Sequence, residues 1–176
     1  MQCVDNTTVL STRAYRYNYA ILFNNATGLA KIKNNVVYVH QDGRPYTNTS
    51  DEGVEAYVYD FYVSSGTAGT HFESDYNDFY RYQVDNGAAY TGYYSATNRT
   101  LISDWQSATG QDNNSIQANP QFASTSDLHI ANTSPARVMG TNLAGYSVDY
   151  DGESRPSVPD MGCDQVPFVA QGPMAG

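Results

Sequence analysis

Two side chains of this chain could act as a base in a proton transfer. Lys33 lies within the run LAKIKNNVVYVH, and His71 follows the glycine-containing stretch Gly66–Gly69. A lysine or a histidine can abstract a proton when nearby groups stabilise the charge that develops. Neither residue stands at a fixed spacing from a carboxylate cluster. Lys33 and His71 are therefore candidate catalytic residues, and the alternatives are a solvated lysine and a loop histidine bonded to backbone.

Two carboxylates stand close together in the sequence SDYND. Asp75 and Asp78 have the residue type that glycoside hydrolysis requires, which is a pair of carboxylates at a fixed separation. A loop aspartate also commonly accepts a hydrogen bond from its own backbone. The second interpretation is structural, and it requires no substrate.

A second acidic group surrounds Gly152. Asp149, Asp151 and Glu153 offer the oxygen ligands that calcium prefers, although the full spacing of an EF-hand loop is absent. Asp149 and Asp151 are therefore the candidate metal ligands, and calcium is the one cofactor that the sequence suggests. The alternative is a turn in which Asp151 and Gly152 reverse the chain and Arg155 pairs with an acid.

The two cysteines lie near opposite ends of the chain. Cys3 and Cys163 show no CxxC or Cys/His spacing of the kind that binds zinc. A disulfide between them would join the two terminal regions. The alternative is that both are small buried apolar residues.

Tyrosine is unusually frequent, with 16 residues in the chain. Several of these tyrosines alternate along strand-like segments, which places them on a common surface. Exposed tyrosine rings suit stacking on sugars or contacts with proteins. The alternative is that tyrosine simply covers a β surface in a lysine-poor chain. The candidate substrate-binding residues are Tyr57, Tyr59, Tyr93 and Tyr94.

The composition limits the possible partners. The 176 residues suffice for one domain, and the formal net charge of −9 argues against binding to nucleic acid or to an anionic membrane surface. No apolar run approaches the ~20 residues of a membrane-spanning helix. The start, MQCVDNTTV, is too polar for a signal peptide, so an exported protein would have lost its signal or be part of a longer chain.

The first half of the chain contains several candidate strands separated by short polar stretches. The residues Asn34 and Asn35 interrupt one apolar segment, and strand character resumes directly after them. Asparagine tolerates the left-handed conformation, so it can turn a strand through a corner. Stacked asparagine amides could then hydrogen-bond from one layer to the next. A bulge or a hairpin in a β-sandwich explains the same pattern equally well.

One short helix is predicted from Asp104 to Thr109. Ser103 is a suitable N-cap and Gln106 completes a capping box, while Gly110 suits a left-handed C-cap. Trp105 should dock this helix on the main body, because a helix of under two turns is not stable alone. After it, short apolar runs alternate with turns, and the end is rich in proline and glycine.

Four segments in the second half carry a family resemblance. They are SDYNDFYR, then WQSATGQDNNSI followed by NPQF, then DLHI followed by SPA, and finally DYDGESRPSVPDMGCD. Their order resembles the C-terminal region of secreted bacterial right-handed parallel β-helix proteins, the pectate-lyase-like superfamily. The resemblance spans Lys31 to Asp164, with few rungs before the cap and Gln165 where the family has an acid.

The resemblance implies an all-β fold, a right-handed parallel β-helix of few rungs with one short helix and an extended C-terminal capping strap. We expect rungs and loops in residues 1–100, a capping module in 101–164 and an extended tail in 165–176. It also implies an extracellular or cell-surface protein.

We expect a carbohydrate-associated role in which this chain caps the fold and has no catalytic site of its own. One alternative is a structural or adhesive protein that self-assembles, as a filament or an oligomer, through open β-helix edges. A third is a small polysaccharide lyase or glycoside hydrolase. The expected partners are a polysaccharide or copies of the chain itself, without nucleic acid and without membrane insertion.

Overall fold

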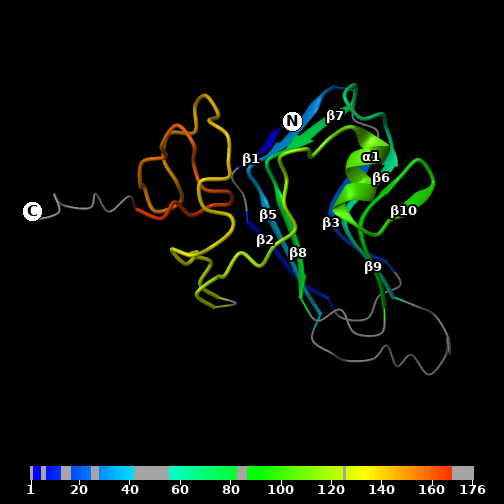
Figure 1. Ribbon diagram of the computed structural model, residues 1–176. Coiled ribbons are helices and arrows are strands. Elements are labelled where there is room, and N and C mark those ends of the chain that lie inside the picture. The colour runs from blue at the N-terminus through cyan, green and yellow to red at the C-terminus, as the bar shows by residue number, and fades with distance from the viewer. Residues whose placement is uncertain are drawn as a thin grey trace, which may run out of the picture.

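The structure is a computed structural model, shown in Figure 1. It describes residues 2–4, 7–12, 17–24, 28–41, 56–82, 87–124 and 126–167. Within these ranges the chain forms short strands in three separate sheets, one helix, and a long C-terminal segment without strands.

The chain passes through the three sheets in the same order three times. The first sheet contains β1 (Gln2–Val4), β4 (Ala30–Lys33) and β7 (Phe72–Asp75), all parallel. The second contains β2 (Thr7–Thr12), β5 (Val36–Gln41) and β8 (Asp78–Tyr82), also parallel. The third contains β3 (Tyr17–Asn24), β6 (Ala56–Ser65), β9 (Gly87–Tyr94) and the antiparallel β10 (Thr97–Arg99). The helix α1 (Ile102–Thr109) follows.

The prediction of an all-β right-handed parallel β-helix with a capping strap was wrong. The described residues form a mixed α/β structure of short strands in small separate sheets, with parallel and antiparallel pairs and a helix. The all-β expectation fails because α1 belongs to the core: the ring of Trp105 is fully buried against Phe61 and Phe72. Strand propensity identified the strands but not the way in which they are joined. The division at residues 100 and 164 stays a prediction, and residues 168–176 lie outside the described part.

The asparagine corner between β4 and β5 is confirmed. Asn34 has a left-handed backbone with φ of 57°, and it separates a strand of the first sheet from a strand of the second. Tyr76, with φ of 58°, holds the equivalent position between β7 and β8. The Asn35 side chain donates from Nδ2 to Oδ1 of Asn77 at 2.9 Å, so the predicted amide pairing between layers is also present.

Two apolar clusters fill the space between the sheets. Phe23, Phe61, Phe72 and Trp105 belong to one, and Val37, Val39, Val58 and Phe79 form the other. Burial of each such side chain stabilises the fold by about 1.5–3 kcal/mol. Gly92 lets the helix approach closely, because a Cβ atom there would lie 2.3 Å from the Trp105 ring.

The helix begins earlier than predicted. Its N-cap is Leu101 rather than Ser103, and the carboxylate of Asp104 accepts a hydrogen bond from the Leu101 N–H at 3.1 Å. The predicted C-cap is confirmed, since Gly110 is left-handed with φ of 65°. The indole Nε1 of Trp105 donates to Oδ2 of Asp112 at 2.7 Å, which ties the helix to the segment after it.

The C-terminal segment lies beside the first two sheets and is attached to the asparagine corner (Figure 1). Asn34 accepts from the Gly162 N–H through its backbone oxygen, and its side chain exchanges two hydrogen bonds with the Thr141 backbone. Met161 and Ile130 pack with Val36 in a third buried cluster. None of the helices in the described residues is long and apolar enough to cross a membrane.

Candidate binding groove

A groove of about 320 Å³ lies between the second sheet and the segment that follows α1. Its walls combine aromatic and aliphatic surface with uncharged polar side chains. The lining residues are Tyr38, Tyr82, Asn119, Gln121, Phe122, Ser124 and Leu128.

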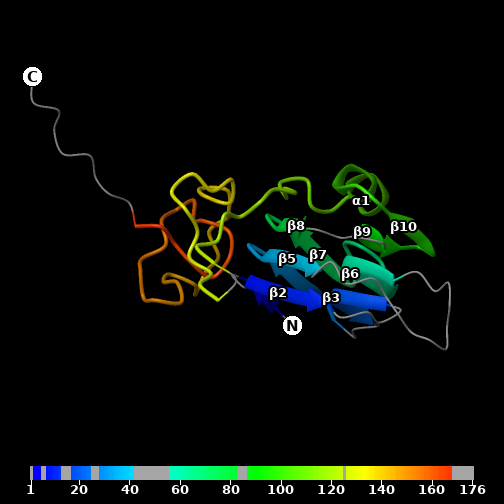
Figure 2. The same cartoon turned by 90° about the horizontal axis from the view of Figure 1, so that it is seen from below.

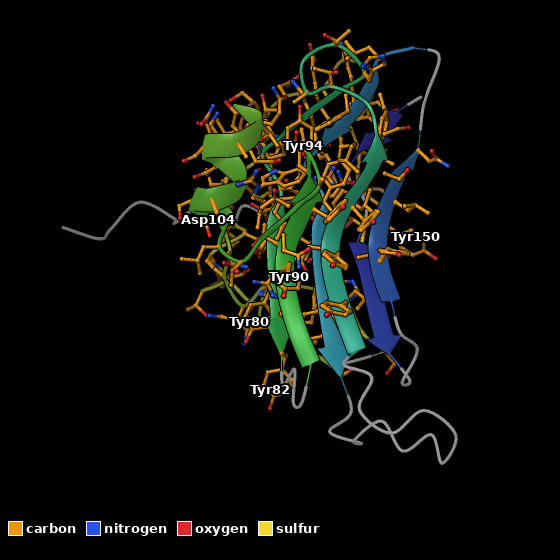
Figure 3. The ribbon with its side chains drawn as sticks, turned by 90° about the vertical axis from the view of Figure 1, so that its right-hand side faces the viewer. Tyr80, Tyr82, Tyr90, Tyr94, Asp104 and Tyr150 are labelled. Atoms are coloured by element: carbon orange, nitrogen blue, oxygen red, sulfur yellow. The ribbon has the colours of Figure 1, made fainter. Side chains whose placement is uncertain are left out.

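The second sheet supplies the tyrosine wall of the groove. In β5, Val37 and Val39 are buried in the core, so the alternation of a strand turns Tyr38 to the outer face. The parallel register places Tyr80 beside Tyr38, with ring centroids 5.6 Å apart. Figure 3 shows Tyr80 and Tyr82 along the outer end of β8.

The opposite wall is a loop that is held by its own hydrogen bonds. Phe122 forms an antiparallel bridge with Ile130 and packs edge-on against Tyr38, with ring centroids 5.6 Å apart. Gln121 adopts a left-handed backbone with φ of 57°, and its Oε1 accepts from the Thr133 hydroxyl at 2.7 Å. Asn119 accepts from the Gln121 N–H at 2.9 Å. These contacts fix the polar groups before any ligand arrives.

None of the described residues that line the groove carries a charged side chain. Burial raises the pKa of the Tyr38 hydroxyl, and the neighbouring Tyr80 and Tyr82 raise it further. The phenol therefore stays neutral at physiological pH and can donate or accept a hydrogen bond. The groove as a whole can bind a neutral molecule that has both apolar faces and hydroxyl groups.

Three of the four predicted tyrosines lie together on the outer face of the third sheet, outside this groove. Tyr57 stacks on Tyr90 at 6.3 Å, and Tyr62 stacks on Tyr93 at 4.5 Å with ring planes 4° apart. Tyr59 is 3% exposed and donates its hydroxyl to Asn98 Oδ1 at 3.0 Å. Because these rings cover one another, little ring face is open for a sugar.

The fourth, Tyr94, lies apart from the other three. Its ring packs against Trp105 and Phe72, each at 6.2 Å, and its hydroxyl accepts from the Ala68 N–H at 3.3 Å. Figure 3 shows Tyr94 close to α1. Its role is therefore to support the helix.

The predicted bases lie at opposite ends of β4. The backbone oxygen of His71 accepts from the N–H of Ala30, at the start of this strand, while Lys33 ends it. The ring Nδ1 of His71 accepts a hydrogen bond from the Thr67 N–H at 3.0 Å, as in the alternative of a loop histidine bonded to backbone. The structure does not bring Lys33 and His71 together.

Both carboxylates of the SDYND segment accept hydrogen bonds from backbone N–H groups. Asp75 accepts from the backbone and side-chain nitrogens of Asn114, each at 2.8 Å. Asp78 is fully buried and accepts from the Ala118 N–H at 2.9 Å. Burial, assisted by the charge of Asp60, raises the pKa of Asp78 to about 7. These contacts fit the structural interpretation of the pair.

The buried ion pair between Asp60 and Arg81 was not predicted from the sequence. Asp60 is fully buried in β6 and pairs with Arg81 of β8, which also donates to Thr91 Oγ1 at 3.4 Å. Burial raises the pKa of Asp60 to about 7, although Arg81 acts in the opposite direction. An aspartate inside the apolar run VEAYVYDFYV was the available signal.

An acidic cluster surrounds His129 in the C-terminal segment. The imidazole contacts Asp127 at 2.5 Å and Asp151 at 3.0 Å. Hydrogen bonding to Asp127, followed by the charge of Asp164, raises the pKa of His129 to about 9. Ligand atoms of His129, Asp151 and Asp164 lie within 4.8 Å of one another, so a cation could be held there. Asp151 was a candidate ligand from the sequence pattern, whereas His129 and Asp164 were not.

The carboxylate of Asp149, a predicted metal ligand, accepts hydrogen bonds from backbone N–H groups. Its Oδ1 accepts from the Asp151 and Glu153 N–H groups at 3.0 and 2.7 Å, and Oδ2 accepts from Gln165 at 2.8 Å. Gly152, with φ of 88°, completes the reversal of the chain. The chain reversal of the turn alternative is present, while the guanidinium of Arg155 donates to the backbone oxygens of Asp160 and Gly162. The predicted pairing of Arg155 with an acid and calcium binding by Asp149 and Asp151 stay predictions.

The disulfide also stays a prediction. Cys163 is partly buried beside the acidic cluster. Cys3 forms part of β1, opposite Ile32 in β4, but its side chain lies outside the described part of the structure.

Comparison with known proteins adds no relative. No protein-family model, curated protein or solved structure matches the chain significantly.

Proposed function

We propose that this chain is a non-catalytic carbohydrate-binding protein that acts outside the cell and binds its ligand in the groove between Tyr38 and Phe122. The observation that carries the proposal is the described lining of the groove, in which three aromatic rings and a leucine stand beside the uncharged polar residues Asn119, Gln121 and Ser124. The extracellular setting rests on the resemblance of the closing segments to secreted bacterial proteins.

The chemistry of a sugar suits this lining. A pyranose presents C–H groups on one face and hydroxyls around its edge, so it pairs with an aromatic surface and with neutral donors and acceptors. Side-chain amides such as those of Asn119 and Gln121 offer a donor and an acceptor next to one another. The contact of Gln121 with Thr133 fixes the orientation of one amide.

Among the described lining residues there is no lysine, arginine or histidine, which favours a neutral glycan over a polyuronate. A uronate carboxylate would lose its hydration without gaining a charged partner, which is costly. A lyase would also need a base beside that carboxylate, and Lys33 and His71 do not line the groove. The geometry of the groove therefore fits binding of a glycan without catalysis better than it fits a lyase reaction.

The test is a titration of the purified chain with neutral and uronate oligosaccharides by calorimetry. We expect neutral oligosaccharides to bind, and Tyr82→Ala to weaken binding by roughly two- to tenfold, since one aromatic contact is worth ~0.5–1.5 kcal/mol. Tyr82 is 40% exposed, so its loss should spare the fold. Tyr150→Ala is the matched control, because Tyr150 is 86% exposed and lies outside the groove.

Two results would overturn the proposal. One is the absence of binding to any neutral oligosaccharide, and the other is equal binding by the Tyr82→Ala variant. A rise in absorbance from unsaturated products on a polyuronate, lost in Lys33→Ala or His71→Ala, would support the lyase alternative instead.

A further inference from the structure

Each of the three sheets ends on the same side of the molecule in an edge strand. The strand orders place β1, β2 and β3 at the ends of their sheets. Among the described residues no further strand pairs with these three. Figure 2 shows β2 and β3 on the side of the molecule opposite α1 and β10.

The opposite side is covered by the chain itself. The Asp112 N–H donates to Ser74 in β7 at 2.8 Å, and Ile116 exchanges two backbone hydrogen bonds with the strand start at Asn77 and Phe79. In the third sheet, β10 pairs with β9. The segment after α1 therefore bonds to Ser74 in β7 and to the start of β8, and β10 covers residues Gly92–Tyr94 of β9.

The edge strands on the first side carry little of the usual protection of an edge. Natural edge strands avoid pairing through charged residues, proline or bulges. The register of β3 against β6 shifts between Phe23 and Asn24, at the very end of the strand, so the rest of β3 is regular. The sequences of β1, β2 and β3 are QCV, TTVLST and YNYAILFN, and none contains a charged residue, a proline or a glycine. Charged residues make up 15% of the whole chain, so their absence from these strands is notable for an exposed edge. The edge at the opposite end of the third sheet differs, because β10 has three residues and one is Arg99.

We propose that β3 pairs edge to edge with the β3 strand of a second copy of this chain. A two-fold axis across the middle of β3 makes the two strands antiparallel and joins two four-stranded sheets into one. The partner is a second copy because such an axis matches an uncharged edge with an identical uncharged edge. The inference is independent of the carbohydrate-binding proposal.

The covered side limits the assembly to a dimer. A head-to-tail filament needs a matching open edge at both ends of each copy. At the second end, the segment from Asp112 to Ile116 bonds to β7 and β8, and the third sheet ends in β10, which has three residues and contains Arg99. The closed dimer also extends the outer tyrosine face of the third sheet, since Tyr19 of β3 lies 4.6 Å from the Tyr62 ring.

The net charge of −9 on each copy opposes association at low salt. Repulsion between two acidic chains is screened as ionic strength rises, while backbone pairing along an uncharged edge is affected little. We therefore expect the dimer fraction to increase with salt.

Analytical ultracentrifugation of the purified chain tests the proposal. The expected species are the 19.3 kDa chain and its dimer, in a concentration-dependent equilibrium. Leu22→Lys places a charge on β3 at a side chain that is 55% exposed, and it should remove the dimer. Val148→Lys is the control, because Val148 is 52% exposed but lies in the C-terminal segment. Circular dichroism confirms that each variant is folded.

Hydrogen exchange provides a second measurement that does not depend on a variant. Exchange of the β3 amides should slow as protein concentration rises, while β10 at the other end of the sheet should not change. A monomer at every concentration and salt, or polymers beyond the dimer, would overturn the inference. A dimer that Leu22→Lys leaves intact would also overturn it. Sugar binding by the Leu22→Lys variant separates this outcome from failure of the groove proposal.

Discussion

The side chain of Asn35 donates from Nδ2 to Oδ1 of Asn77 at 2.9 Å, across 42 residues of sequence. The same Asn77 oxygen accepts from the Asn35 backbone N–H at 3.0 Å. The Asn77 amide nitrogen in turn contacts the Ile32 backbone oxygen, Ser74 Oγ and Asp112 Oδ1. One buried amide thus joins two successive corners to the segment that follows the helix.

We expect Asn77→Ala to be strongly destabilising. The change leaves the Asn35 donors and the Ile32 oxygen without this partner, and each unsatisfied buried group costs about 1–3 kcal/mol. The free energy of unfolding should therefore fall by roughly 3 kcal/mol or more. Denaturation in urea, monitored by circular dichroism, measures this loss.

Asn113→Ala is the matched control for Asn77→Ala. Asn113 is exposed and donates a single hydrogen bond, at 3.3 Å, to the Gly110 oxygen. Its loss should change stability by about 0.5 kcal/mol or less. Similar effects of the two substitutions would contradict a special role for the buried amide.

The corner was predictable because its physics is local. The doublet Asn34–Asn35 breaks an apolar segment, and asparagine tolerates the φ of 57° that the corner needs. The way the strands assemble into three separate sheets depends on contacts between distant residues. The start of the helix was misplaced because Leu101 has no capping side chain, and Asp104 supplies the hydrogen bond instead.

The binding groove was harder to predict than the fold. Tyr38 and Phe122 lie 84 positions apart, and neither was a candidate from sequence. Alternation did place Tyr57 and Tyr93 on one face, but it could not reveal that their rings cover neighbouring rings. Tyr94 follows Tyr93 directly in the strand, and successive side chains of a strand point to opposite faces. The Tyr94 ring therefore points inward, toward Trp105.

The buried carboxyl of Asp78 predicts a pH-dependent stability. Its pKa is raised by burial from 3.8 to about 7, so between these values the folded state holds a proton that the unfolded state has lost. The free energy of unfolding should then fall as pH rises from about 4 to 7, and this contribution should level off above that. Asp60, whose pKa is also raised to about 7, adds to the same slope.

Thermal denaturation across this pH range, on the wild type and Asp78→Asn, measures the effect. Asparagine keeps an oxygen for the Ala118 N–H but cannot titrate, so the slope with pH should become shallower. Asp75→Asn is the control, because Asp75 lies at the surface contact with Asn114. A slope that is unchanged in Asp78→Asn would show that other groups cause the pH dependence.

The last prediction separates a structural role for Asp149 from a metal-binding one. Its carboxylate accepts from three backbone N–H groups, of Asp151, Glu153 and Gln165. Asp149→Asn keeps one oxygen but turns a donor toward Gln165, so we expect a loss of about 1–3 kcal/mol. This loss should be the same with calcium and with a chelator, because the turn needs no cation. Asp151→Asn should have a smaller effect, since Asp151 is exposed and reaches His129 at 3.0 Å. If calcium raises the melting temperature of the wild type and neither variant responds, the two aspartates bind the metal and the purely structural role is wrong.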